Sequence, residues 1–574
     1  MFMRNLQEAH RHGKQNEFII PVQRGIRMKT VARFFIDALK HYKAEFSVAL
    51  AMALFSAAYG VFIPLASKQF VQLVMENCDW VLILQGTAVF CGLYLLQTFI
   101  KVWFYRSLDQ FGGKYMSHLS QKLELKLQQG NMLDIQKMNE GTIRNILFSD
   151  VLNIFTAIGH HLPSVISSGL LIVSLLTFLF ISDVPTALLI CIASALGIII
   201  SIVSKKYITS ASGTVNMKIK GFDSCCTEYV KMLPMVQTNN ILGYYQEKTN
   251  INISSFIDAS RKADVPIYLW SGLASGYFSV FSILLSAVLV WPAAQKSVVD
   301  LVFFTLTASL IIEESQKASQ LTQQIIRNLP SFSHAEDILS LRKATGDLEL
   351  KDAISKIELD DVTFSYSEKT DAVLHGFSCE FLKGDIIRVN GSNGSGKTTF
   401  YKLLTGLYQP ASGTLKINGI PLQDISRESL NKSVLYISQD EKCLNESISQ
   451  YLHIISGKAI SDEKTKAWLE EVGLKDIHEP ISGNGDSLSG GQRKKLYTLK
   501  LLAAADQASV IILDEVAAGM DSDTVKILQD IIKRIAESKD KIIFITDHGD
   551  ASNIWSSNSV LTINHGTARF VRII

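Results

Sequence analysis

The segment Gly391-Ser-Asn-Gly-Ser-Gly-Lys-Thr398 decides how the second half of this chain folds. It fits the pattern Gly-x-x-x-x-Gly-Lys-Ser/Thr, and it lies between the strand-like run Asp385–Val389 and the helical run Thr398–Leu404. In a strand–loop–helix of this kind, glycines let backbone N–H groups surround phosphate oxygens, and the helix N-terminus adds a favourable dipole. The sequence therefore predicts an α/β domain of the P-loop NTPase type.

This loop is expected to hold ATP with Mg²⁺. Lys397 is expected to reach the terminal phosphates, and the Thr398 hydroxyl is expected to bind Mg²⁺. The residues expected to contact ATP here are Gly391, Ser392, Asn393, Gly394, Ser395, Gly396, Lys397, Thr398 and Thr399.

A second acidic feature follows a buried-strand pattern. Val510-Ile-Ile-Leu-Asp514 is apolar up to its carboxylate, and Glu515 comes next. A carboxylate at the end of a strand beside the phosphate loop can hold the Mg²⁺ shell, which assigns that role to Asp514. Glu515 can then position the attacking water as a general base.

The segment Leu488-Ser-Gly-Gly-Gln492 precedes another helical run, Arg493–Ala504. Ser489, Gly490, Gly491 and Gln492 could form a second anion-binding helix N-terminus, or an ordinary helix cap. One chain with two phosphate-binding surfaces suggests a nucleotide enclosed between two copies.

The first half of the chain has a different composition. Apolar residues make up 47% of the 574 residues and charged residues 19%, but the long uncharged runs lie between Phe46 and Ile312. About 20 helical residues cross a bilayer core roughly 30 Å thick. We therefore predict a six-helix transmembrane domain. Its spans are Phe46–Ala66, Val81–Ile100, Leu162–Ile181, Val184–Val203, Val265–Ala294 and the shorter Leu301–Ile312.

Basic residues predict the orientation in the cytoplasmic membrane. Lysines and arginines precede the first span and fill the loops after the second and fourth spans, so these segments and the ATP-binding half should be cytoplasmic. The expected domains are a polar N-terminal tail (1–27), the transmembrane domain (28–340) and the nucleotide-binding domain (341–574). The tail lacks the apolar segment of a signal peptide.

Few strongly polar residues lie in or beside the spans. Glu313 and Glu314 are either part of a translocation path or solvated at the inner membrane border. His160 and His161 are expected to mark a helix end. The seven cysteines form no Cys-x-x-Cys pair, which argues against zinc, and a net charge of +2 gives no bias toward nucleic acid.

Residues 350–574 resemble the nucleotide-binding domain of the ATP-binding cassette (ABC) superfamily, and Leu488–Gln492 matches its signature motif without change. From about Met28 the whole chain resembles an exporter half-transporter. The resemblance implies further roles. These are adenine stacking for Tyr366, Mg²⁺ sensing for Gln439, a position across the dimer for Asp521, a γ-phosphate contact for His548, and the first coupling helix within Glu140–Asp150.

The chain departs from the family pattern at three places. Ile481-Ser-Gly483 lacks the usual glutamate, Ala518-Gly-Met-Asp521 differs from the common Ser-Ala-Leu-Asp, and Asp547 replaces a threonine. None of these changes removes a catalytic group.

We therefore expect a membrane-embedded, ATP-hydrolysing exporter. The expected partner is a second half-transporter, most simply another copy of this chain, although a heterodimer is an alternative. The expected cargo is a small or modified peptide. The alternatives are a lipid or drug-like amphiphile, inward transport of a metal chelate, and an ATP-gated channel or regulator.

Overall fold

The computed structural model describes residues 28–77, 80–138, 140–290, 297–367, 371–438, 441–474, 480–482, 487–546, 557–564 and 566–573. The chain divides into two compact units. One comprises Met1–Leu123 with Gly141–Leu339, and the other comprises Glu124–Glu140 with Ser340–Ile574. Each unit is described by itself.

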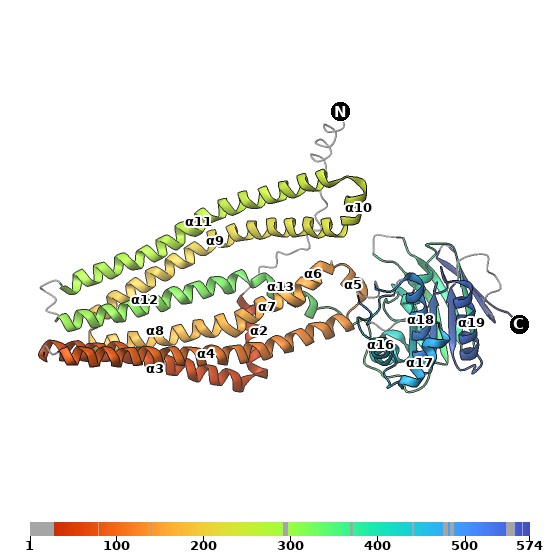
Figure 1. Ribbon diagram of the computed structural model, residues 1–574, viewed down its shortest axis with the longest axis horizontal. Helices are drawn as coiled ribbons and strands as arrows, with labels where there is room; N and C mark the ends of the chain where they lie inside the picture. Colours follow the sequence, from red (N-terminus) through yellow and green to blue (C-terminus); the bar gives the residue numbers. More distant parts are fainter. Residues whose placement is uncertain are drawn as a thin grey trace, which may run out of the picture. The chain divides into compact units, whose positions relative to one another are not determined.

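Long helices make up the first unit (Figure 1). They are α2 (Met28–His41), α3 (Lys43–Asn77), α4 (Trp80–Gln129), α6 (Glu140–Asn145), η1 (Ile146–Asp150), α7 (Val151–Phe155), η2 (Thr156–His161), α8 (Leu162–Ser182), α9 (Val184–Lys231), α10 (Leu233–Asn239), α11 (Leu242–Val290), α12 (Val298–Arg327) and α13 (Leu329–Leu339).

Each predicted span overlaps one of these helices, and the run Val265–Ala294 is helical as far as Val290. Within the described residues, three helical segments are long and apolar enough to cross a membrane, namely Lys43–Glu76, Trp80–Gln129 and Glu140–Ser182. Phe303, Phe304 and Ile311 of α12 pack with Leu175 and Leu179 of α8 in a buried cluster. Such apolar contacts hold the helices together along their inward faces.

The prediction that His160 and His161 mark a helix end is wrong. Both lie in η2, a π-helical turn that continues directly into α8. His160 therefore lies inside a continuous helical segment, where its side chain has two neighbours. Its Nε2 lies 3.0 Å from Asp109 Oδ1 on α4, and its ring meets Phe155 edge-on.

The second unit contains two β-sheets, one antiparallel and one mixed. The four-stranded sheet has the order β2-β1-β4-β5 and is antiparallel, while the six-stranded sheet has the order β10-β9-β3-β8-β7-β6 and is parallel apart from β10. The strands are β1 (Lys356–Phe364), β2 (Leu374–Leu382), β3 (Ile386–Asn390), β4 (Ser412–Ile417), β5 (Ile420–Pro421), β6 (Val434–Ile437), β7 (Val510–Asp514), β8 (Ile542–Thr546), β9 (Ser559–Asn564) and β10 (Thr567–Arg572).

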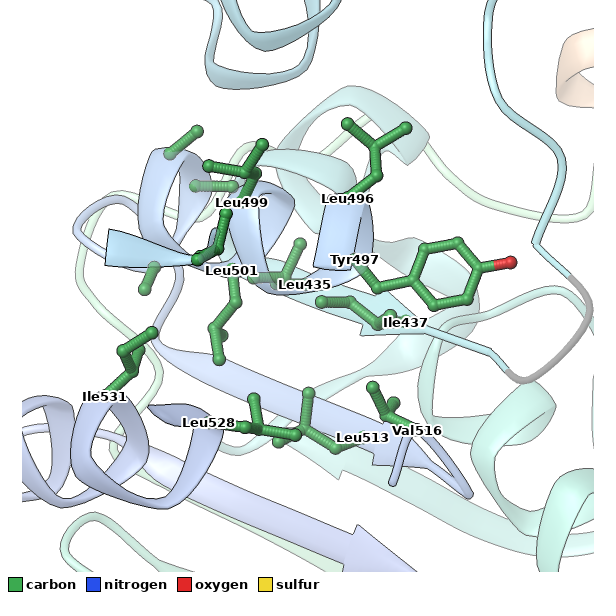
Figure 2. Packing of buried hydrophobic residues seen from close by; sticks show 14 of the residues in the cluster. Leu435, Ile437, Leu496, Tyr497, Leu499, Leu501, Leu513, Val516, Leu528 and Ile531 are labelled. Atoms are coloured by element: carbon green, nitrogen blue, oxygen red, sulfur yellow. The ribbon is translucent and has the colours of Figure 1, made fainter. Parts of the chain in front are cut away.

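Helices cover these sheets. They are α14 (Lys397–Leu404), η4 (Leu422–Asp424), α15 (Arg427–Ser433), α16 (Ile448–Ser456), α17 (Asp462–Glu471), α18 (Gly490–Ala504) and α19 (Ser522–Ala536). Every residue of β7 and β8 is buried, as expected for central parallel strands with both faces covered. Figure 2 shows one side of this core, where Leu496 and Leu499 of α18 and Leu528 of α19 gather over β6 and β7.

The second unit also contains α5 (Met132–Gln136), which belongs to the membrane half of the sequence. Asn131 caps it by accepting a hydrogen bond from the Leu133 N–H at 2.9 Å, and Met132 and Leu133 pack against a core cluster of the cassette. The Tyr408 hydroxyl donates to Gln136 Oε1 at 3.1 Å.

This packing corrects the coupling-helix expectation. Gly141–Leu339, which includes most of Glu140–Asp150, groups with the first unit, whereas α5 groups with the cassette. The segment of the first inner loop that packs with the cassette is therefore α5. A five-residue helix with three apolar side chains carries too little periodicity for sequence analysis to find it.

Candidate nucleotide site

The phosphate loop joins the end of β3 to the start of α14, as predicted. Gly394 and Gly396 adopt φ values of 76° and 108°, which favour glycine. A Cβ on Gly391 would lie 2.4 Å from the Ile563 carbonyl oxygen, so only glycine fits there. The glycines of the motif thus permit a tight turn against the neighbouring strand.

Lys397 is the first residue of α14 and is buried within this loop. Its Nζ donates to the carbonyl oxygens of Gly391, at 2.7 Å, and Ser392, at 3.1 Å. The loop backbone therefore holds the ammonium group beside the N–H groups that begin the helix. A cation and a helix N-terminus together make a surface suited to phosphate.

Strand register brings Asp514 to the same edge of the sheet. Thr546 of β8 pairs with Val389 of β3 on one side and with Asp514 of β7 on the other. Carboxyl ends of parallel strands form the usual ligand-binding edge of such a sheet. The Thr398 hydroxyl closes the connection by donating to Asp514 Oδ2 at 3.1 Å.

The two oxygens of the Asp514 carboxylate differ in their hydrogen bonding. Tyr436 on β6 also donates to Oδ2, at 3.2 Å, while Oδ1 is buried and has no hydrogen-bond partner among the described residues. Burial raises the pKa of Asp514 above its ordinary value. A buried, unpartnered carboxylate oxygen next to a threonine hydroxyl is an oxygen-donor set that Mg²⁺ accepts, so these residues fit the ion.

Sequence analysis did not single out the Tyr436 side chain, although it lies three residues before Gln439. Residues alternate in a strand, so Leu435 and Ile437 point into the core shown in Figure 2 and Tyr436 points the other way. This alternation in the sequence could have indicated that the Tyr436 side chain points away from that core.

Glu515 follows Asp514 in a left-handed backbone conformation, with φ of 56°. Such a conformation costs a non-glycine residue about 1–3 kcal/mol, and it persists where the surrounding structure fixes it, often at functional sites. The turn places a second carboxylate directly after the strand that ends at Asp514.

Tyr366 lies beside the start of α14 and is 41% exposed. Its hydroxyl shares a 2.8 Å hydrogen bond with Thr399, and its ring meets Phe364 and Tyr408 edge-on. The buried Thr399 side chain thus positions Tyr366. Ordered in this way, the ring is a rigid and partly exposed aromatic surface.

The signature segment begins α18 with a capping box. Ser489 accepts from the Gln492 N–H at 3.2 Å, and Gln492 Oε1 accepts from the Ser489 N–H at 2.9 Å. A Cβ on Gly490 or Gly491 would meet no described atom within 4 Å. The cap interpretation therefore holds for the two side chains, while the glycine backbone beside them lies open.

Asp521 caps α19 by accepting from the Thr524 N–H, at 2.9 Å, and hydroxyl, at 2.8 Å. These bonds lower the pKa of its carboxyl. Four residues singled out from the sequence, Gln439, Gly483, Asp547 and His548, lie outside the described residues.

Comparison with known proteins agrees with this architecture. Residues 374–518 match the family model for ABC transporters, and residues 46–313 match the model for the ABC transporter transmembrane region. An uncharacterised ABC transporter ATP-binding protein of Bacillus subtilis is 23% identical over 507 residues, covering 84% of this chain and 82% of its own.

Further relatives have described cargoes. An ATP-dependent lipid A-core flippase of Pseudoalteromonas atlantica is 23% identical over 498 residues, covering 81% of this chain and 83% of its own. A β-(1→2)glucan export ATP-binding/permease protein of Rhizobium meliloti is 24% identical over 423 residues, covering 71% and 70%.

Among solved structures, a bacterial Atm1-family ABC exporter with ATP bound has the same fold. Its TM-score is 0.79 at 17% identity, and the match covers 92% of this chain and 95% of that chain. One polypeptide thus combines a helical membrane region with an ATP-binding cassette. This is the architecture of a half-transporter, which implies a dimer partner. The chain belongs to the ABC transporters, as an exporter-type half-transporter that couples ATP hydrolysis to transport across the membrane.

Proposed function

We propose that two copies of this chain form a homodimeric exporter with two composite ATP sites. Each site would combine the Lys397 loop of one copy with Ser489–Gly491 of the other. The observation that carries this proposal is the open glycine backbone at the start of α18, where a Cβ on Gly490 or Gly491 would meet no described neighbour within 4 Å. A γ-phosphate in the loop needs such a second donor surface from a partner.

Within each site the residues would divide the work. Tyr366 would stack on adenine, and Lys397 with the loop residues would bind the phosphates. Thr398, Asp514 and Gln439 would hold Mg²⁺, which when bound neutralises phosphate charge. Glu515 would take the proton from the attacking water as it approaches the γ-phosphate, and His548 would contact that phosphate.

The test uses purified protein in lipid vesicles. Wild-type protein should hydrolyse ATP only with Mg²⁺, and Lys397→Ala should abolish turnover because the phosphates lose their main cation. Residual turnover comparable to wild type in Lys397→Ala would contradict the site assignment.

We propose a small or modified peptide as the first candidate cargo. Glu314 of α12 supports it, because its carboxylate faces α8 and accepts a hydrogen bond from the buried Ser168 hydroxyl at 2.5 Å. Its side chain is only 14% exposed, with Lys317 3.7 Å away. A carboxylate inside a membrane bundle marks a cargo or ion path, and a peptide ammonium group matches it.

A lipid-containing or carbohydrate cargo is the second candidate, because the relatives named above move lipid A-core and β-(1→2)glucan. The experiment compares ATPase stimulation by small peptides, glycolipids and glucans in vesicles. Peptide stimulation that falls in Glu314→Gln but not in the matched Glu313→Gln, whose residue is exposed, would support the peptide path. Stimulation by glycolipid or glucan alone would favour the second candidate.

A further inference from the structure

A cluster of metal-binding side chains lies in the first unit, where α2 meets α4. Asp37, His41 and His118 each offer a ligand atom, and these atoms all lie within 4.8 Å of one another. The imidazole rings of His41 and His118 are 4.7 Å apart between centroids, with an interplanar angle of 34°. Neither residue type nor position connects this cluster to ATP hydrolysis.

The local hydrogen bonds suit His41 for metal binding. Its Nδ1 lies 2.9 Å from the Asp37 carbonyl oxygen, and a carbonyl can only accept, so Nδ1 carries the proton. That tautomer leaves the lone pair of Nε2 available. A backbone carbonyl bound to the second ring nitrogen is a common outer partner of a metal-bound histidine.

The carboxylate of Asp37 is also oriented from outside the cluster. The hydroxyl of the buried Tyr115 donates to Oδ2 at 3.5 Å, and Lys122 Nζ lies 3.6 Å from the same oxygen. Oδ1 faces His41 at 3.7 Å from its Nδ1. One oxygen is therefore engaged by α4, and the other faces His41.

We propose that Asp37, His41 and His118 form a binding site for a first-row transition metal ion of the Zn²⁺ type, which joins α2 to α4. Two imidazoles and one carboxylate are a ligand set that Zn²⁺ uses, with water in the fourth position. The lack of Cys-x-x-Cys pairs excludes only a thiolate version of such a site. The bound ion would fasten α2 to α4.

Zn²⁺ binding to tag-free, nucleotide-free, full-length protein tests the proposal by calorimetry and metal analysis. Wild-type protein should bind one ion per chain at this site, and His118→Ala should weaken the affinity by at least about tenfold, as loss of a metal-site residue does. The matched control is His160→Ala, whose residue also faces a carboxylate, Asp109, but lies outside the cluster. A second control, His10→Ala with His12→Ala, removes the N-terminal histidines.

Lys122→Gln gives the sharper test. It removes a cation that competes with Zn²⁺ for Asp37, so the Zn²⁺ affinity should rise severalfold. If Asp37 only pairs with Lys122 and does not bind Zn²⁺, the affinity should not change. Thermal unfolding in chelator verifies that each variant is folded, and Zn²⁺ should raise the melting temperature of wild type but not of His118→Ala. Wild-type affinity in His118→Ala, an equal loss in His160→Ala, or no Zn²⁺ binding by wild type would overturn the proposal.

Discussion

Helices α14 and α18 of the cassette both begin beside glycines, but the surroundings of these glycines differ. At the start of α14, added Cβ atoms would meet the Ile563 carbonyl at Gly391 and the Leu374 side chain, at 3.1 Å, at Gly396. At the start of α18, added Cβ atoms on Gly490 and Gly491 would meet no described atom within 4 Å. The first helix start is thus enclosed by its own chain, and the second is open among the described residues.

This difference supports the proposal that two copies share each ATP site. At the enclosed helix start, Lys397 is bound to its own loop and Thr398 to Asp514. At the open helix start, no described side chain of the same chain covers the glycines.

The largest effect is expected at the enclosed surface, from Glu515→Gln. Removing the general base should lower ATP turnover by about 10²–10⁴-fold, because the attacking water loses its proton acceptor. ATP binding, followed with a fluorescent nucleotide, should stay near wild type. Vigorous turnover by the purified variant would refute this role for Glu515.

Substitution of Gly391 should lower the stability of the cassette, whereas substitution of Gly491 should lower only the ATPase activity. Gly391→Ala forces a Cβ against a backbone oxygen and should destabilise the cassette by about 1–3 kcal/mol, as overpacking does. Gly491→Ala should change stability by no more than about 0.5 kcal/mol, yet lower ATPase activity, since the added methyl group enters the space proposed for the partner's phosphate. Denaturant unfolding and ATPase assays measure both. Similar unfolding midpoints for the two variants would contradict the difference between an enclosed Gly391 and an open Gly491.

Adenine binding should depend on Tyr366 to a smaller degree. Tyr366→Ala should weaken ATP binding by about 1–2 kcal/mol through loss of an aromatic contact, and Tyr366→Trp should preserve it. Unchanged affinity in the alanine variant would show that another residue holds the base.

The smallest effect is on thermal stability and concerns the ionisation of Asp514. Because burial raises its pKa in the folded state, the folded protein binds this proton more tightly than the unfolded chain does. The nucleotide-free protein should therefore gain stability as the pH falls through that raised pKa, and lose it as the pH rises.

Asp514→Asn removes this dependence, because an amide does not ionise, and should raise the melting temperature at neutral pH by a few degrees. It should also abolish Mg²⁺-dependent turnover. A lower melting temperature for the variant in the absence of nucleotide and Mg²⁺ would contradict the argument.

Much of the cassette could be predicted from the sequence, because its motifs combine with strand and helix patterns. The loop at Gly391–Thr398 and the strand ending at Asp514 lie where those patterns place them. The six predicted spans overlap long helices, since uncharged runs of that length fit little else.

Features set by tertiary packing could not be predicted. His160 lies within a continuous helix and pairs with Asp109 of α4, and no local sequence pattern predicts that tertiary contact. Asp37 and His118 come together from two helices with no fixed spacing between them. Nor does any sequence pattern reveal whether the glycines of Ser489–Gly491 are covered or open, because that depends on which segments fold over them.

The central claim is that each ATP site is built from two chains, and one heterodimer tests it directly. One chain carries Ser489→Arg, which places a bulky cation in the proposed interface, and the other carries Lys397→Ala. Ser489→Asn, which keeps a capping side chain, is the control for loss of the α18 cap. The two chains bear different tags so that the heterodimer can be isolated.

The measurement is photo-crosslinking of a trapped ATP analogue, read separately on each chain, because cooperativity between sites could silence turnover even at an intact site. If sites are composite, both substitutions fall in one site, and the other traps nucleotide at the wild-type level on the Ser489→Arg chain. If each chain instead builds its own site, both sites are damaged. Finding no site with wild-type trapping would contradict the shared-site account.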